Sequence, residues 1–284
     1  MMKTISIINL KGGVGKTTSA VTLASIFATA FKKRTLLIDL DSQFNASSYY
    51  LPQPDFDDLD ELESYIKRII VDNELTPLTE YSVQDVLKDS DFDVNKAIYK
   101  TPYPNLNVMP SFITLVEAEK YMGSINSAPQ QYRLKDQLAK ISDQFDYCII
   151  DCSPSQDLLN TNGLVASDEV LVALKPDFWS LNGWLVIYKL IKTVQSYSPT
   201  VHFFGTFLTM YRKNVSSHTF LKDQLEKNMD RYLGIEIRHA AAADNVTYTK
   251  ELLFDSSRYE EGKPQRNGIG EDYLKLAKRL IEEV

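Results

Sequence analysis

Residues 11–18 read KGGVGKTT, and this glycine-rich run limits the folds open to the chain more than any other feature. The ordinary phosphate-binding loop, G-x-x-x-x-G-K-[ST], would place a glycine at position 10, but Leu10 stands there and Lys11 follows it. The apolar run at 4–10 predicts a buried strand, and apolar residues on one face predict a helix at about 17–31. A glycine-rich turn between a strand and a helix predicts an α/β domain with a phosphate site at the turn.

The loop carries the groups that a bound phosphate needs. Lys16 is expected to reach the β- and γ-phosphates, and the Thr17 hydroxyl is expected to bind Mg²⁺ directly. A glycine-rich turn without a ligand is the alternative, and the flanking strand and helix argue against it. The remaining loop residues would surround the phosphates closely with backbone amides: Gly12, Gly13, Val14, Gly15 and Thr18.

Lys11 adds a positive charge that a structural turn does not require. It precedes Lys16 by five residues, which is too near for it to fold back onto the same phosphate. Phosphoryl transfer spreads negative charge over the transferred group, and a cation from a neighbouring subunit can stabilise that charge as an arginine finger does. The position of Lys11 therefore suggests that it reaches the nucleotide of a second copy.

The rest of the chain alternates short apolar runs with longer amphipathic stretches. Further strands are predicted at 34–41, 106–111, 147–151, 169–176 and 201–210. Helices fit at about 130–144, 157–166, 179–196, 216–232 and 270–283. Apolar strands joined by crossover helices predict an α/β fold with a doubly wound, mostly parallel central sheet flanked by helices.

The length of 284 residues allows one large α/β domain or two small ones, and without a low-complexity linker we expect a single domain, 1–284. Its least regular part is 44–105, which holds short helix candidates such as 82–89. The acidic run at 55–63 is interpreted as a solvated helix face.

Composition excludes several classes of protein. A net charge of -7 is not that of a general polyanion binder, so any contact with nucleic acid must come from a local basic patch. Cys148 and Cys152 are too few for a disulfide framework and are expected to be small buried thiols. The three histidines lack metal-ligand spacing. We find no signal peptide and no run long enough to span a membrane, and expect a cytoplasmic protein.

The segment 11–18 resembles the deviant Walker A loop of the ParA, Soj and MinD type ATPases, in which position 10 needs no glycine. The resemblance covers nearly the whole chain, including 171–191 and the closing helix at 273–284, and is loose over 44–105. It implies a P-loop ATPase that uses ATP and Mg²⁺. It also implies that Lys11 crosses the interface of a homodimer closed over two ATP molecules.

Two further motifs match this family. LLIDLDSQFNAS, 36–47, is similar to the segment whose second aspartate, here Asp41, orients the water that attacks the γ-phosphate; Asp39 is a further candidate for the metal. The proline and glycine usual in this segment are Ser42 and Phe44 here. YCIIDCSPS, 147–155, matches the strand whose final aspartate, Asp151, holds Mg²⁺ through a water. Capping or turn roles are the alternatives for these aspartates.

GTPases share a phosphate loop but have two motifs that this chain lacks. Their aspartate is followed three residues later by glycine, and Pro154 holds that place after Asp151. Ile98 stands in NKAI where the guanine-reading aspartate would be. ATP is therefore the preferred nucleotide, and by the resemblance Thr209 and Met210 lie beside its adenine.

Partition ATPases of this family bind DNA without sequence preference, which needs only suitably placed cations. The chain departs from its relatives at 238–251, where alanine and asparagine replace arginines, and a scattered basic surface without a partner is the alternative. The candidate DNA contacts are Arg212, Lys213, Lys250, Arg258, Lys263 and Arg266.

The resemblance leaves three functions open. The first is a plasmid or chromosome partition ATPase associated with the nucleoid and stimulated by a ParB-like centromere-binding protein. No helix-turn-helix domain is expected before the first strand, so operator repression is not expected. The second is a MinD-type ATPase at a membrane, although the last helix ends in Glu282 and Glu283 rather than lysines. The third is a ligase related to dethiobiotin synthetase or an iron protein, and the positions of the two cysteines argue against the latter.

Overall fold

The computed structural model describes residues 1–51, 58–70, 79–125, 129–241, 243, 252–254 and 268–283. Within them, eight strands form one sheet in the order β3-β4-β2-β5-β1-β6-β7-β8. Every neighbouring pair is parallel except β3 with β4 at one edge. The strands are β1 (Lys3–Ile8), β2 (Thr35–Leu40), β3 (Tyr99–Lys100), β4 (Leu106–Met109), β5 (Tyr147–Cys152), β6 (Glu169–Leu174), β7 (His202–Tyr211) and β8 (Tyr232–Arg238).

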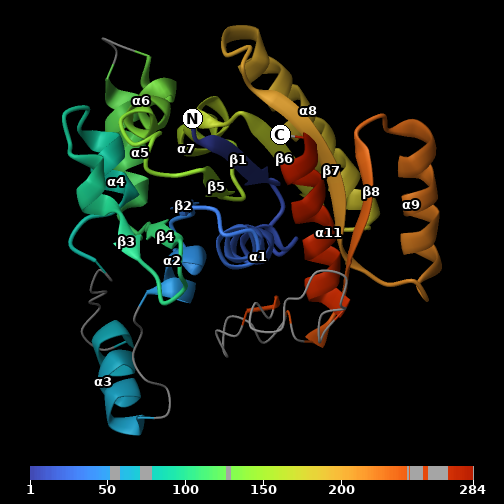
Figure 1. Ribbon diagram of the computed structural model, residues 1–284, viewed down its shortest axis with the longest axis horizontal. Helices are drawn as coiled ribbons and strands as arrows, with labels where there is room; N and C mark the ends of the chain where they lie inside the picture. The colour runs from blue at the N-terminus through green and yellow to red at the C-terminus, as the bar shows by residue number, and fades with distance from the viewer. Residues whose placement is uncertain are drawn as a thin grey trace.

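Helices cover both faces of the sheet (Figure 1). One face carries α1 (Lys16–Thr29), α2 (Asn45–Tyr50) and α11 (Gly268–Glu283). The other carries α4 (Val83–Lys88), α5 (Leu115–Ser124), α6 (Arg133–Ala139), α7 (Leu158–Ala166), α8 (Phe178–Tyr197) and α9 (Ser216–Asn228). Two 3-10 turns, Val94–Ala97 and Gln130–Tyr132, complete the regular structure described, together with α3 (Leu59–Ile70), which extends away from the sheet (Figure 1).

Two hydrophobic cores lie on the two faces because strand side chains alternate in direction. Leu37 of β2 packs into the core beneath α1, whereas Leu36 and Ile38 pack into the core beneath α4 to α8. All three are fully buried. This double burial explains why the strands are almost continuously apolar, and it confirms the predicted doubly wound α/β fold.

Every predicted strand and long helix is present, with some shifted ends. Helix α6 is shorter than predicted: residues 130–132 form a 3-10 turn and the helix ends at Ala139. We did not predict β8 or α5. Strand β8 places apolar Leu233, Ile235 and Ile237 at alternate positions, which is the pattern of a half-buried strand. Gly234, at φ 65°, lies between two of them and lowers the strand propensity of the segment.

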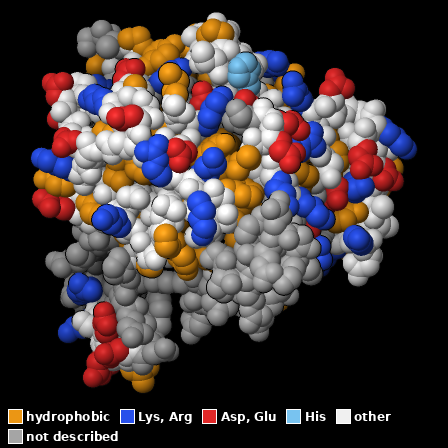
Figure 2. Space-filling model, viewed as in Figure 1, with side chains coloured by type: hydrophobic (Ala, Val, Ile, Leu, Met, Phe, Trp, Pro, Cys, Tyr) orange, Lys and Arg blue, Asp and Glu red, His pale blue; other side chains and the backbone are white. Residues whose placement is uncertain are grey.

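The described charged surface is mixed rather than dominated by one sign. Basic and acidic side chains are interspersed over the face shown in Figure 2. The described part of the acidic run, from Asp58, is exposed and lies at the start of α3. Among the described helices, none is long and apolar enough to cross a membrane.

The closing helix packs its apolar face against the sheet. In α11, Tyr273, Ala277 and Leu280 belong to the same core as α1, and each is at most 2% exposed. Tyr273 also shares a hydrogen bond with Ser19 of α1 over 2.9 Å. This face of α11 is therefore engaged inside the protein.

Candidate nucleotide site

The glycine-rich loop opens a cavity at the carboxyl edge of the parallel strands. The cavity has a volume of about 390 Å³, and Gly12 to Thr18 form one wall. The opposite wall comes from the ends of β2, β5 and β7 through Asp41, Pro154 and Met210. Ligands of doubly wound sheets bind at this edge, where loops from several strands meet.

The loop has the backbone conformation that its glycines predict. Gly13 and Gly15 have φ values of 68° and 81°, in the left-handed region where residues with a side chain are strained. Gly15 is also the N-cap of α1, and its carbonyl accepts a hydrogen bond from the Ser19 amide. The positive end of the α1 dipole therefore faces the cavity.

Lys16 lies along the inside of this loop. The residue is only 6% exposed, and its Nζ donates to the Lys11 carbonyl over 3.2 Å. Burial lowers the pKa of Lys16, while the neighbouring carboxyl groups of Asp151 and Asp41 oppose that shift. The geometry holds one ammonium group at the floor of the cavity.

Strand β7 supports the far side of the loop. The Thr209 hydroxyl donates to the Val14 carbonyl over 2.8 Å. Met210 adopts a left-handed φ of 53° and lines both the main cavity and a smaller one beside it. The smaller cavity, of about 50 Å³, is lined by Gly15, Thr18 and apolar residues that include Ile237 and Tyr273. If the phosphates of a nucleotide lie in the loop, its base would extend toward Thr209 and Met210.

Asp39 and Asp41 lie two positions apart at the end of β2 but have different surroundings. Asp39 is fully buried and accepts hydrogen bonds from the Asp41 amide and from the amide and hydroxyl of Ser47. Burial raises the pKa of Asp39 to about 6 despite these bonds. Asp41 is 9% exposed, and its carboxylate accepts one described hydrogen bond, from the Gln43 amide. Asp39 holds the loop, and Asp41 faces the cavity.

Phe44 occupies the place of the family's usual glycine in a glycine-like conformation. Its φ is 44°, which costs a residue with a side chain of order 1 kcal/mol. The Phe44 ring packs against Phe112, with ring centres 5.3 Å apart. The contact offsets part of this strain and fixes the loop that carries Asp41.

Asp151 is fully buried at the end of β5, paired in register with Asp39. Neither carboxylate oxygen has a hydrogen-bond partner among the described residues. Burial raises the pKa of Asp151 well above its usual range, with Asp39 adding to the shift and Thr17 and Lys16 opposing it. Unpaired buried carboxylate oxygens beside a threonine hydroxyl are the donor set that Mg²⁺ prefers. The residues therefore fit a magnesium ion.

Asp151→Asn is expected to stabilise the nucleotide-free protein by about 1–3 kcal/mol at neutral pH, because a neutral amide costs less to bury than an unpaired carboxylate. The raised pKa means that Asp151 keeps its proton in the native state above pH 3.8, so the contribution of Asp151 to wild-type stability falls as the pH rises from there. Denaturant unfolding at about pH 4 and pH 7 should give a stability gap that widens with pH. Stabilisation by Mg-ATP should be lost. Parallel pH curves would contradict the burial argument.

The Lys11 side chain bonds the first residue before α8. Its Nζ bonds both carboxylate oxygens of Asp177, at 2.9 and 2.7 Å, in an ion pair that is partly exposed. The Lys11 amide donates to Asn9 Oδ1, and Asn9 is anchored to the Ala173 carbonyl. Sequence reasoning did not identify Asn9 or Asp177, although Asp177 lies two residues before the predicted helix 179–196, near where an N-cap is expected.

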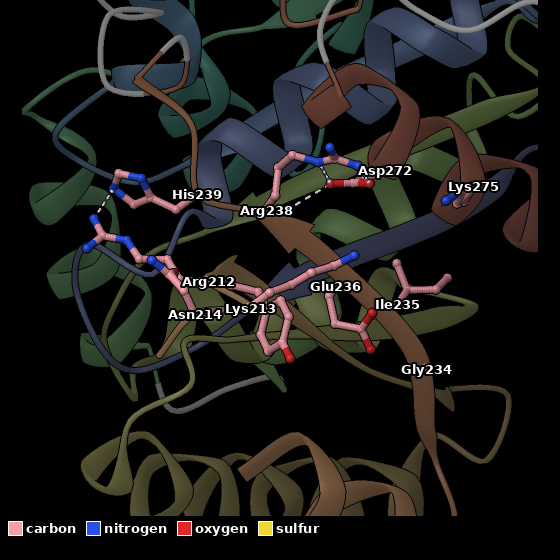
Figure 3. A pocket seen from close by; sticks show the side chains of 11 residues that line it. Arg212, Lys213, Asn214, Gly234, Ile235, Glu236, Arg238, His239, Asp272 and Lys275 are labelled. Atoms are coloured by element: carbon pink, nitrogen blue, oxygen red, sulfur yellow. Dashed lines mark hydrogen bonds and ion pairs between the residues drawn. The ribbon is translucent and has the colours of Figure 1, made fainter. Parts of the chain in front are cut away.

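Two of the six candidate DNA contacts line a second pocket, of about 470 Å³ (Figure 3). Arg212 and Lys213 follow β7, and Lys275 of α11 lines the same pocket. Arg212 contacts His239 over 2.9 Å, and Arg238 is paired with Asp272 over 2.7 Å. Sequence reasoning missed Lys275. The other four candidates lie outside the described residues: Lys250, Arg258, Lys263 and Arg266.

Both cysteines are buried free thiols, as predicted, at 0% and 1% exposure for Cys148 and Cys152. Burial raises the pKa of each thiol far above its usual range. Neither thiol is therefore a ready metal ligand or nucleophile.

Known proteins resemble the chain in sequence and in fold. The family model described as an AAA domain matches residues 2–202. The chromosome-partitioning ATPase Soj of Treponema pallidum is 32% identical over 87% of this chain and 85% of its own. The sporulation initiation inhibitor protein Soj of Bacillus subtilis is 32% identical over 99% of this chain and 98% of its own.

A solved structure of different activity shares the same fold. It is cobyrinic acid a,c-diamide synthase of Mycobacterium smegmatis with bound ADP and magnesium, with a TM-score of 0.75 and 24% identity, covering 99% of this chain and 95% of that one. This likeness concerns the fold alone. The fold is thus also that of a diamide synthase, whereas the sequence relatives above are Soj proteins.

Proposed function

The chain belongs to the Soj/ParA family of chromosome-partitioning ATPases, and on that premise we propose that it hydrolyses ATP to ADP and phosphate as the timer of a DNA-partition cycle. In this cycle an ATP-bound homodimer binds DNA and is released after slow hydrolysis. The whole chain, 1–284, acts as one ATPase unit on the nucleoid in the cytoplasm. The observation that carries the proposal is the phosphate loop with the partly exposed Lys11 at its start, Asp41 in the lining of the cavity, and Asp151 fully buried at the end of β5.

The loop residues would bind the ATP phosphates through backbone amides and Lys16. Thr17 and Asp151 would hold Mg²⁺, Asp151 through a water; the ion would neutralise charge on the β- and γ-phosphates. Asp41 is the acceptor that orients the attacking water, because its carboxylate faces the cavity. Asp39, whose oxygens accept bonds from the Asp41 loop, positions that loop. Thr209 and Met210 would contact the adenine.

Lys11 would act on the nucleotide of a second copy. Its ammonium bonds Asp177, at the start of α8, whereas the Lys16 ammonium bonds the backbone of the loop. A cation on the rim can meet a facing γ-phosphate only if two copies pair over their nucleotides. Two ATP molecules would then be enclosed between the copies.

DNA would bind through the cationic pocket of Arg212, Lys213 and Lys275. Non-specific binding requires cations that neutralise phosphates, and a local group suffices in a chain of net charge -7. A ParB-like centromere-binding protein would stimulate hydrolysis. The engaged apolar face of α11 argues against a MinD-type membrane anchor at this helix.

Retention of the purified protein on random-sequence DNA tests the proposal. With Mg-ATP we expect retention on DNA and not on anionic vesicles, and with Mg-ADP retention on neither. Lys213→Ala should weaken DNA binding and lower the salt dependence by roughly 0.9 logarithmic units for each phosphate contact removed. Lys189→Ala, which removes an exposed charge from α8, is the matched control. DNA binding that ignores the nucleotide, or retention on vesicles alone, would overturn the proposal.

A further inference from the structure

The segment that follows β4 runs beside the loop that carries Asp41. Strands β2 and β4 are parallel neighbours in register, so the residues that follow each strand also lie side by side. Ser111 belongs to this segment and is buried, at 2% exposure. It is not among the described residues that line the nucleotide cavity. A buried hydroxyl group thus lies next to the Asp41 loop and outside the lining of the cavity.

Ser111 holds the Asp41 loop at two points. Its hydroxyl donates to the Asp41 carbonyl over 2.6 Å, and its amide donates to the Ser47 hydroxyl over 2.9 Å. Asp41 opens the loop after β2, and Ser47 lies in the first turn of α2, which follows that loop. The Ser47 hydroxyl in turn donates to the Asp39 carboxylate over 2.7 Å. One residue after β4 is thereby bonded to both ends of the loop.

The bond from Ser111 fixes the second half of the Asp41 backbone. The Asp41 amide donates to the Asp39 carboxylate over 3.0 Å, which anchors the amide to β2. The Asp41 carbonyl accepts from Ser111 and also from the amide of Phe44, which belongs to the loop itself. Since the amide is held from β2 and the carbonyl from the segment after β4, the direction in which the Asp41 side chain leaves the backbone is fixed.

We propose that Ser111 is a positioning residue for ATP hydrolysis, which holds the backbone of Asp41 so that the carboxylate meets the attacking water. This inference rests on the proposed function, in which Asp41 orients that water. It adds a residue that acts through Asp41 rather than on the nucleotide.

A small displacement of Asp41 should slow the reaction. An acceptor must lie within hydrogen-bond distance of the water, and misplacement by about 1 Å can cost about 10²-fold in rate. Ser111 is buried, so solvent does not readily replace its hydroxyl. The ring contact between Phe44 and Phe112 keeps the loop near its place when the hydroxyl is removed, and Lys16 and the amides of the phosphate loop are untouched. Loss of the hydroxyl should therefore change the rate and not the affinity for ATP.

Ser111→Ala is expected to lower the single-turnover rate of ATP hydrolysis about tenfold, with the affinity for a fluorescent ATP analogue within about twofold of the native value. Ser25→Ala is the matched control, because Ser25 is also a buried serine whose hydroxyl donates to a backbone carbonyl, that of Thr22 in α1, over 2.9 Å. The control should hydrolyse ATP at the wild-type rate. A normal rate in Ser111→Ala, an equal loss in Ser25→Ala, or loss of ATP binding by Ser111→Ala would each overturn the positioning role.

Ser111→Cys separates the hydrogen bond from packing, because a thiol fills the place of the hydroxyl but is a weak donor. Its hydrolysis rate should lie between those of Ser111→Ala and the wild-type protein. A wild-type rate in Ser111→Cys would assign the effect to packing and remove the hydrogen bond from the account.

The Asp41→Asn background shows whether Ser111 acts through Asp41. In that background Ser111→Ala should leave the residual single-turnover rate unchanged, since the carboxylate that Ser111 positions is already gone. A second loss of about tenfold would show that Ser111 acts elsewhere. If the wild-type protein hydrolyses ATP through Asp41 and Ser111→Ala does so equally well, this inference is wrong and the proposed function stands. If the wild-type protein does not hydrolyse ATP, both fall together.

Discussion

Lys11→Ala is expected to lower the ATP hydrolysis rate by about 10³-fold or more, the scale of a lost arginine finger. The variant keeps the loop glycines, Lys16 and Thr17, so single protomers should still bind ATP with near-native affinity. What it loses is an ammonium group that bonds Asp177 rather than a group of its own loop. Phosphate release and binding of a fluorescent ATP analogue, measured on the same samples, separate the two effects.

The matched control for this variant is Lys189→Ala, which removes an exposed lysine of α8 at no proposed site. Its hydrolysis rate should equal that of the wild-type protein. A Lys11→Ala protein that hydrolyses ATP normally would remove the lysine from the reaction. Loss of ATP binding as well as hydrolysis would instead show that Lys11 supports the loop of its own protomer.

Asp41→Ala is expected to abolish measurable hydrolysis, a loss of about 10²-fold or more, while leaving the ATP-bound dimer intact and retained on DNA. The carboxylate faces the cavity and accepts only the Gln43 amide among described groups, so its removal deletes the acceptor for water and little else. Sedimentation and DNA retention with ATP should therefore match or exceed those of the wild-type protein.

Asp41→Asn separates the acceptor role from the loop contact, because the amide oxygen can still accept from Gln43. Hydrolysis should remain strongly reduced, since an uncharged amide is a poor acceptor for the attacking water. Normal hydrolysis in either variant would assign the water to another group. Loss of pairing in both would mean that Asp41 is structural.

The sequence predicted the strand, glycine-rich loop and helix at the start of the chain well because their determinants are local. Gly13, Gly15 and Lys16 fall within one loop between a strand and a helix, and each lies where that pattern requires. Asp151 was identified from the end of an apolar strand, and the sheet brings it to the loop because the carboxyl ends of parallel strands share one edge. The parallel sheet was predicted from short runs of apolar residues that alternate with helical segments.

The residues that were missed depend on contacts between distant segments. Asp177 lies 166 positions after Lys11, and only the neighbouring positions of β1 and β6 bring the two together. Lys275 reaches the cationic pocket from α11, more than sixty positions after Lys213. Strand β8 lies at the edge of the sheet and has a glycine inside it, which lowers its strand propensity. Local patterns carry no information about the contacts of Asp177 and Lys275, so no reading of single segments could have supplied them.

The most direct measurement mixes Lys11→Ala and Asp41→Ala proteins and records phosphate release. In a mixed dimer, the site of the Lys11→Ala copy keeps its own Asp41 and receives the lysine of the other copy, so it has every group that hydrolysis requires. We predict that each protein alone is inactive and that the mixture recovers up to about half of the wild-type rate per mixed dimer. A mixture no more active than the sum of its parts would contradict the exchange of lysines between two copies.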